Sequence, residues 1–155
     1  MRFRSLCLTG ACAMFFMVLA AVGSQVFLDW QPCVICVEIR AWLLLAGLLL
    51  LTAAVVKPSV VTKVITLLSF VPMSMASWDS YKLFSLEQGW VQSFSCSPFA
   101  RFPSWLPLHE WMPLFFQPQA ICGETVKSIL LPLSVWPALV SMIFAVALII
   151  KIKRN

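Results

Sequence analysis

Residues 31–40 read QPCVICVEIR, and this stretch lies between two long apolar segments of the 155-residue chain. Cys33 and Cys36 form a Cys-x-x-Cys pair, and Arg40 follows four residues after the second cysteine. Two cysteines at this spacing either close a small disulfide ring or contribute to a metal site, depending on compartment and partners. The segments on either side therefore decide what the pair can do.

A helix that begins near Pro32 would bring Cys33, Cys36 and Arg40 to one helix face. Proline costs little in a first helical turn, and the positive end of the helix dipole favours a thiolate there. Arg40 adds a permanent positive charge, which suits redox chemistry or an anionic, electron-accepting ligand. The alternative interpretation is that Arg40 is only an interfacial anchor that reaches to the lipid headgroups.

The composition predicts an integral membrane protein. The chain is 61% hydrophobic and 11% charged, whereas a soluble domain is usually about half apolar and a quarter charged. The net charge of +5 does not indicate a nucleic-acid partner, because the basic residues lie at the ends of apolar runs and form no patch. We expect residues 1–155 to form one membrane domain.

Four segments are long enough to approach the roughly 20 residues that cross a bilayer. They are residues 6–28, 33–56, 60–78 and 133–150. Pro72 predicts a kink or local break within the third span. Small residues at 20–24 also allow a cleaved signal peptide, but the first apolar run exceeds the roughly 7–15 residues of a signal core.

The expected fold class is therefore all-α, a four-transmembrane-helix bundle with connecting loops at about 29–36 and 79–132. The second loop is long and contains the aromatic and proline-rich run 102–116. Tryptophan and phenylalanine beside polar residues predict helical segments that lie in the plane of the headgroups.

Charge asymmetry predicts the orientation of this bundle. Basic residues fall on one side of the four-span arrangement: Arg2, Arg4, Lys57, Lys63, Lys151, Lys153 and Arg154. Acidic residues fall on the other: Asp29, Glu38, Asp79, Glu87, Glu110 and Glu124. The positive-inside rule then places both termini in the cytoplasm and both loops outside, or in the periplasm, where disulfides are permitted.

Four cysteines share the outer face: Cys33 and Cys36 as a tight pair, Cys96 and Cys122 as a wide pair. A four-cysteine zinc site usually shows two tight pairs, so this spacing speaks against a metal. Two disulfides that exchange with each other fit better. A structural disulfide between Cys96 and Cys122, worth about 2–4 kcal/mol, stays open as the alternative for that pair.

The remaining candidate side chains are assigned no chemistry. Cys7 and Cys12 lie in the first span, where cysteine is a common small hydrophobe. His109, the only histidine, is expected to be a surface residue of the second loop. Neither a hydrolytic triad nor a phosphate-binding glycine loop is indicated.

Three motifs together resemble the DsbB family of disulfide-bond-formation membrane proteins. They are the Pro-Cys-x-x-Cys pair with Arg40, the run RFPSWLPLHEWMP at 101–113, and the cysteines Cys96 and Cys122 that flank this run. The resemblance covers nearly the whole chain, including the spans, both loops and the orientation.

The resemblance implies a bacterial inner-membrane thiol:quinone oxidoreductase with catalytic Cys33, Cys36, Cys96 and Cys122. A reduced, periplasmic DsbA-like oxidase of thioredoxin fold would attack Cys96, and the released Cys122 would attack Cys33. Cys36, beside Arg40, would then pass electrons to ubiquinone or menaquinone. Cys36 and Arg40 are the implied quinone-binding residues, and the other partners are membrane lipid and the quinone itself.

One part of the chain departs from the family pattern. Lys82, Leu83 and Phe84 stand where a quinone-side histidine would be sought, so the second contact of the quinone stays unassigned. Two alternatives remain open. One is a specialised paralogue that serves a dedicated oxidase; the other is a non-catalytic membrane module with structural disulfides or a metal site, which gives Arg40 no task.

Overall fold

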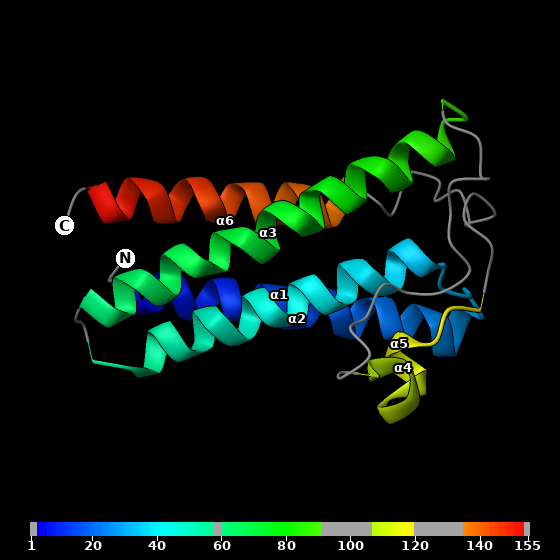
Figure 1. The fold of residues 1–155 in the computed structure, drawn as a ribbon, viewed down its shortest axis with the longest axis horizontal. Coiled ribbons are helices and arrows are strands. Elements are labelled where there is room, and N and C mark those ends of the chain that lie inside the picture. Colours follow the sequence, from blue (N-terminus) through cyan, green and yellow to red (C-terminus); the bar gives the residue numbers. More distant parts are fainter. Residues whose placement is uncertain (1–2, 58–59, 91–106, 120–134, 154–155) are drawn as a thin grey trace.

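The computed structural model describes residues 3–57, 60–90, 107–119 and 135–153, and the regular elements in these parts are helices (Figure 1). In chain order they are α1 (Phe3–Leu28), α2 (Val34–Val55), α3 (Val60–Glu87), α4 (Leu108–Trp111), α5 (Pro113–Phe116) and α6 (Val135–Lys153). Helices α1, α2 and α3, with 26, 22 and 28 residues, are long and apolar enough to cross a membrane. The expected all-α membrane class is therefore confirmed.

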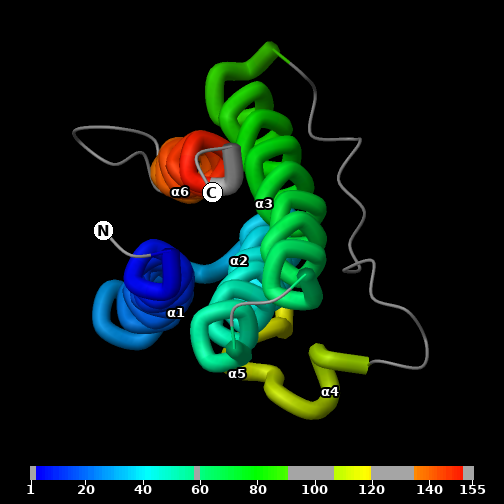
Figure 2. The backbone as a smooth tube through the Cα atoms, turned by 90° about the vertical axis from the view of Figure 1, so that its left-hand side faces the viewer, coloured from blue at the N-terminus to red at the C-terminus, as the bar shows by residue number. Residues whose placement is uncertain are grey.

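The four longer helices run side by side as a bundle (Figure 1, Figure 2). Helix α2 packs against α1 and α3, and α6 packs mainly against α3. Large apolar side chains such as Phe16, Leu67 and Ile143 remain 70%, 64% and 64% exposed on the outside of the bundle. An apolar exterior of this kind suits lipid rather than water.

Glycine makes the contact between α1 and α2 close. A Cβ atom at Gly47 of α2 would lie 3.2 Å from Phe15 Cζ and 3.4 Å from Met14 Cβ. At Gly10 of α1, a Cβ atom would lie 3.0 Å from Leu50 Cδ1 and 3.2 Å from Phe144 Cδ1. Small residues let helix backbones approach closely in membrane bundles, so these two positions hold α1 against α2 and α6.

Helix α3 differs from the expectation in its length. It continues past residue 78 to Glu87, so residues 79–87 belong to a helix and not to the second loop. The polar sequence suggested a loop, but Asp79, Ser80 and Leu83 are buried at 3%, 1% and 4% exposure. Packing of this face against the bundle extends the helix beyond its apolar part. The helix also continues through Pro72.

The start of α2 lies close to the expected one. The helix begins at Val34, two residues after Pro32, with Cys33 as the N-cap residue in an extended conformation (φ −79°, ψ 170°). An N-cap side chain accepts a hydrogen bond from an N–H of the first turn, and the sulfur of Cys33 does so here. Cys36 remains in the first turn, as expected.

Candidate functional site

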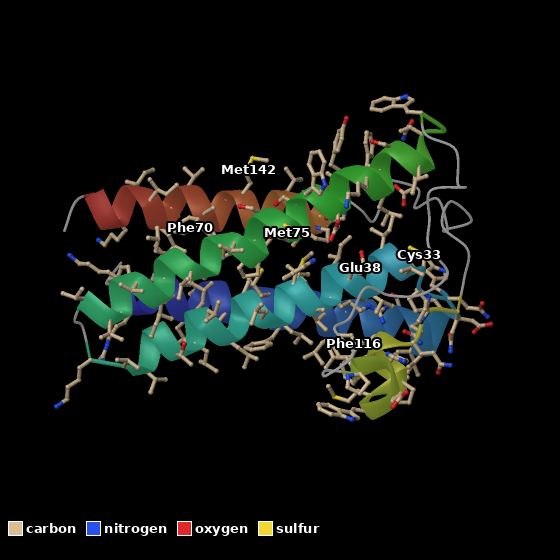
Figure 3. The ribbon with its side chains drawn as sticks, viewed as in Figure 1. Cys33, Glu38, Phe70, Met75, Phe116 and Met142 are labelled. Carbon is tan, nitrogen blue, oxygen red and sulfur yellow. The ribbon has the colours of Figure 1, made fainter. Side chains whose placement is uncertain are left out.

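The tight cysteine pair lies at the end of the bundle where α4 and α5 lie (Figure 1, Figure 3). Cys33 is fully buried and Cys36 is partly buried, and both are free thiols. Their sulfurs are 2.7 Å apart, and the N–H of Cys36 donates to the Cys33 sulfur at 3.3 Å. Two thiols held this close need only a small movement to close a disulfide.

The environment of the pair makes its two members unequal. The hydrogen bond between the two thiols and the burial of Cys33 both raise the pKa of the Cys33 thiol. Cys36 is the member that lies one helical turn from Arg40.

Arg40 is buried at 5% exposure and connects three elements. Its Nη1 donates to Oε1 of Gln25 at 2.9 Å and to the carbonyl oxygen of Phe115 at 3.3 Å. Its Nη2 donates to the carbonyl oxygen of Ala21 at 3.1 Å. The interpretation of Arg40 as an anchor that reaches to the headgroups is therefore wrong, because the guanidinium is held inside by α1 and α5.

The positive charge of Arg40 acts on the cysteine pair. A buried cation needs polar partners, and those that the described residues supply to this guanidinium are neutral oxygens. Its positive charge interacts with both Cys36 and Cys33. The extension of α3 brings a carboxylate as well, because Glu87 acts on Cys36 with the opposite sign. Cys36 is thus under the influence of both a cation and an anion.

A segment of the second loop docks onto the start of α2. The N–H of Gln119 donates to the carbonyl oxygen of Pro32 at 2.9 Å, directly before Cys33. Phe116 of α5 is 2% exposed, and α5 packs against α2. Figure 3 shows Phe116 at the same end of the bundle as Cys33. Cys96 and Cys122 lie outside the described residues, but Cys122 follows Gln119 by only three positions.

The residues at the expected place of a quinone-side histidine have other contacts. Lys82 forms an ion pair with Asp79 at 2.8 Å and lies 5.9 Å from the ring centroid of Trp78. The other oxygen of Asp79 accepts the indole N–H of Trp42 at 3.1 Å. This network joins α2 to α3 and leaves the second quinone contact unassigned.

The other side chains considered above lie away from the pair. Cys7 is buried and Cys12 is exposed, both as free thiols of α1. The His109 side chain is half exposed in α4, with Nε2 3.9 Å from a carboxylate oxygen of Glu110. Within the part of the chain that the structure describes, no cluster of three or more His, Cys, Asp or Glu side chains could hold a metal.

Sequence reasoning missed four groups at the site: the Gln25 amide, the Ala21 and Phe115 carbonyls and Glu87. Gln25 and Phe115 are 15 and 75 positions from Arg40, so no spacing rule connects them. A polar residue within a predicted span was an available signal for Gln25. Glu87 was assigned to a loop because the extent of α3 was misjudged.

Comparison with known proteins gives a consistent picture. The family model described as disulfide bond formation protein DsbB matches residues 3–151. Disulfide bond formation protein B 2 of Pseudomonas aeruginosa is 32% identical over 106 residues, 65% of this chain and 61% of that protein. Proteins named disulfide bond formation protein B from Shewanella loihica and Psychromonas ingrahamii are each 29% identical, over 90% and 88% of this chain and 78% and 79% of their own lengths.

Proposed function

The chain belongs to the DsbB family of disulfide bond formation proteins, and we propose that it oxidises a periplasmic dithiol protein and passes the electrons to a membrane quinone. Family membership makes it a membrane oxidoreductase that serves disulfide formation. The observation that carries the finer proposal is the site itself: two free sulfurs 2.7 Å apart at the start of α2, with the buried Arg40 one turn further on.

The residues around Cys36 fit a quinone. Ile39 and Leu43 of the same stretch of α2 are buried in the apolar core at 4% and 2% exposure, so the charge of Arg40 lies in apolar surroundings, where it is poorly screened. The hydrogen bonds that Arg40 makes with the described residues go to neutral oxygens, so they leave its positive charge in place. When bound, ubiquinone or menaquinone supplies the two-electron acceptor, and a nearby cation stabilises negative charge that develops on its oxygens.

The two cysteines at the start of α2 can supply the two electrons that such an acceptor takes up. Closing the Cys33–Cys36 disulfide forms one S–S bond and releases two electrons and two protons. Cys36, next to Arg40, would be the sulfur nearer to a bound acceptor, and both thiols give up their protons as the ring closes. Arg40 holds negative charge near Cys36 without taking a proton itself.

The second loop would bring oxidising equivalents to the partner protein. A reduced DsbA-like thiolate attacks Cys96 of a Cys96–Cys122 disulfide and expels Cys122 as a thiolate. Once Cys33 and Cys36 have been oxidised to a disulfide, the Cys122 thiolate attacks Cys33, forms a Cys33–Cys122 bond and expels Cys36 as a thiolate. The docking of Gln119 on Pro32 supports the second step. Gln119 precedes Cys122 by three positions in the sequence, and Pro32 directly precedes Cys33.

We further propose one domain that spans the bacterial inner membrane four times with both termini in the cytoplasm. Helix α6, with 19 residues, is about 28 Å long and runs beside α3, which suits a fourth span. The exposed Trp111, Met112 and Leu114 of the α4–α5 region suit a segment that lies at the headgroups.

A mixing experiment tests the proposed function. Purified protein receives a reduced periplasmic oxidase and a soluble ubiquinone analogue, and quinone absorbance and oxidase thiols are followed together. We expect one quinone consumed per dithiol oxidised, no turnover with Cys33→Ser or Cys96→Ser, and normal turnover with Cys12→Ser as the control. Turnover that survives Cys33→Ser, or quinone that stays oxidised with the wild type, contradicts the proposal.

A further inference from the structure

Gln25 holds Arg40 from the last turns of α1. The residue is 9% exposed, and its Oε1 accepts from Arg40 Nη1 at 2.9 Å. The carbonyl oxygen of Ala21, one helical turn earlier, accepts from Nη2 at 3.1 Å. Helix α1 thus presents two acceptors to the two ends of the guanidinium fork, which fixes its plane and direction.

The acceptor at position 25 is an amide, although a carboxylate would bind the guanidinium more strongly. The bond to Gln25 has one charged partner, the guanidinium, and a carboxylate would make both partners charged. A carboxylate would also form an ion pair and remove most of the field that the guanidinium exerts on its other neighbours. Glutamine has nearly the same shape as glutamate, so at this position the difference between them is one of charge.

The field of Arg40 matters here because the cysteine pair lies within it. Arg40 interacts electrostatically with Cys36 and Cys33, and among the described residues Glu87 also acts on Cys36. A second carboxylate at position 25 would leave two anions and one cation around the Cys36 sulfur.

We propose that Gln25 is a positioning residue that fixes Arg40 beside the Cys33–Cys36 pair while leaving its positive charge available to the Cys36 sulfur and the electron acceptor. This inference rests on the proposed function, because it assigns the charge a task in the same reaction. It predicts that charge at position 25 matters more than the hydrogen bond.

Two variants separate charge from structure. Gln25→Glu keeps the acceptor and strengthens the bond, whereas Gln25→Leu removes the acceptor and leaves the charge of Arg40 unpaired. In the fully reduced protein, the rate at which iodoacetamide alkylates Cys36 is measured by mass spectrometry of the Cys33–Cys36 peptide between pH 6 and 9. The dithiol–disulfide equilibrium of the same peptide is measured in dithiothreitol buffers.

We expect Gln25→Glu to lower the alkylation rate of Cys36 at neutral pH by about tenfold, because the new carboxylate would offset the positive charge of Arg40. One opposite charge near a thiol typically shifts its ionisation by at least that factor. The disulfide should become favoured by a similar factor, and tenfold corresponds to about 30 mV. Gln25→Leu should change both quantities less than Gln25→Glu does. Gln31→Glu, an exposed position two residues before Cys33, is the charge control and should leave both near wild type.

A purely structural role predicts the opposite order, with Gln25→Leu the more damaging change and Gln25→Glu close to wild type; that order overturns the inference. An equal effect of Gln31→Glu and Gln25→Glu overturns it as well. A double variant adds a check: with Arg40→Met present, Gln25→Leu should add nothing, and additive effects contradict action through Arg40.

These readouts need neither quinone nor a partner protein. If the wild type fails to reduce quinone but the order of the variants holds, the proposed function fails and the role of Gln25 toward Arg40 stands. If quinone reduction is normal and the order is reversed, only the inference about Gln25 fails.

Discussion

Arg40 is held by groups that lie far from it in the chain. The sequence predicted that Arg40 would share a helix face with the cysteine pair, since that follows from helical periodicity. The partners of its guanidinium, on α1 and α5, follow only from tertiary packing. Periodicity also placed Cys33 in the first turn of the helix, but Cys33 lies one residue earlier as the N-cap, and its sulfur accepts a hydrogen bond from the Cys36 N–H.

Replacing Arg40 tests how much its charge and its geometry contribute. We expect Arg40→Met to slow oxidation of the cysteine pair by a soluble ubiquinone analogue by about 100-fold, the usual cost of removing a group that stabilises developing negative charge. Arg40→Lys should recover part of this loss, because it keeps the charge but cannot reach three acceptors at once. The measurement is the single-turnover rate; wild-type rates in both variants would remove Arg40 from the mechanism.

The helices differ in how far the sequence could predict them. Helices α1 and α2 follow from their apolar runs, with ends close to those expected. The last turns of α3 do not, because Asp79 looks like a loop residue until its contacts with Lys82 and Trp42 are known. The docking of α5 on α2 depends on a buried phenylalanine within a run of aromatic residues, and composition cannot select which one is buried.

Phe116 is the test of that docking. We expect Phe116→Ala to release α5 from α2, because a buried phenylalanine typically contributes about 3–5 kcal/mol to its packing. The Gln119 amide, which donates to Pro32, should then exchange its hydrogen at least about tenfold faster in deuterium oxide. Leu114→Ala, at a 51% exposed position of the same helix, is the matched control. Unchanged exchange in Phe116→Ala would show that other contacts hold the segment.

At the scale of the whole molecule, charge separates between the two ends of the bundle. The start of α1, the end of α2, the start of α3 and the end of α6 lie at one end (Figure 1), and α4, α5 and Cys33 lie at the other (Figure 3). Arg4 donates to the carbonyl oxygens of Val55 and Val56 at 3.3 and 3.0 Å, so a cation satisfies the carboxyl end of α2. Hydropathy and charge counting predicted this arrangement because both act on whole segments.

The orientation has its own test. In a background in which the native cysteines are replaced, Ser5→Cys and Gln88→Cys place single exposed thiols at opposite ends of the bundle. In cells with a permeabilised outer membrane, an impermeant maleimide should label Gln88→Cys and should reach Ser5→Cys only after lysis. Labelling in the reverse order would invert the proposed topology.

The central claim is that the Cys33–Cys36 pair delivers electrons directly to a quinone. The most direct measurement is a single turnover without any partner protein: the fully reduced Cys96→Ser/Cys122→Ser variant, which cannot pass a new disulfide on to the second loop, is mixed with one equivalent of a soluble ubiquinone analogue. Quinone absorbance is followed, and the thiols of each cysteine are counted by alkylation and mass spectrometry. The account predicts one quinone reduced per disulfide formed between Cys33 and Cys36, with Cys12 still reduced. Quinone reduction that leaves Cys33 and Cys36 as free thiols would contradict it.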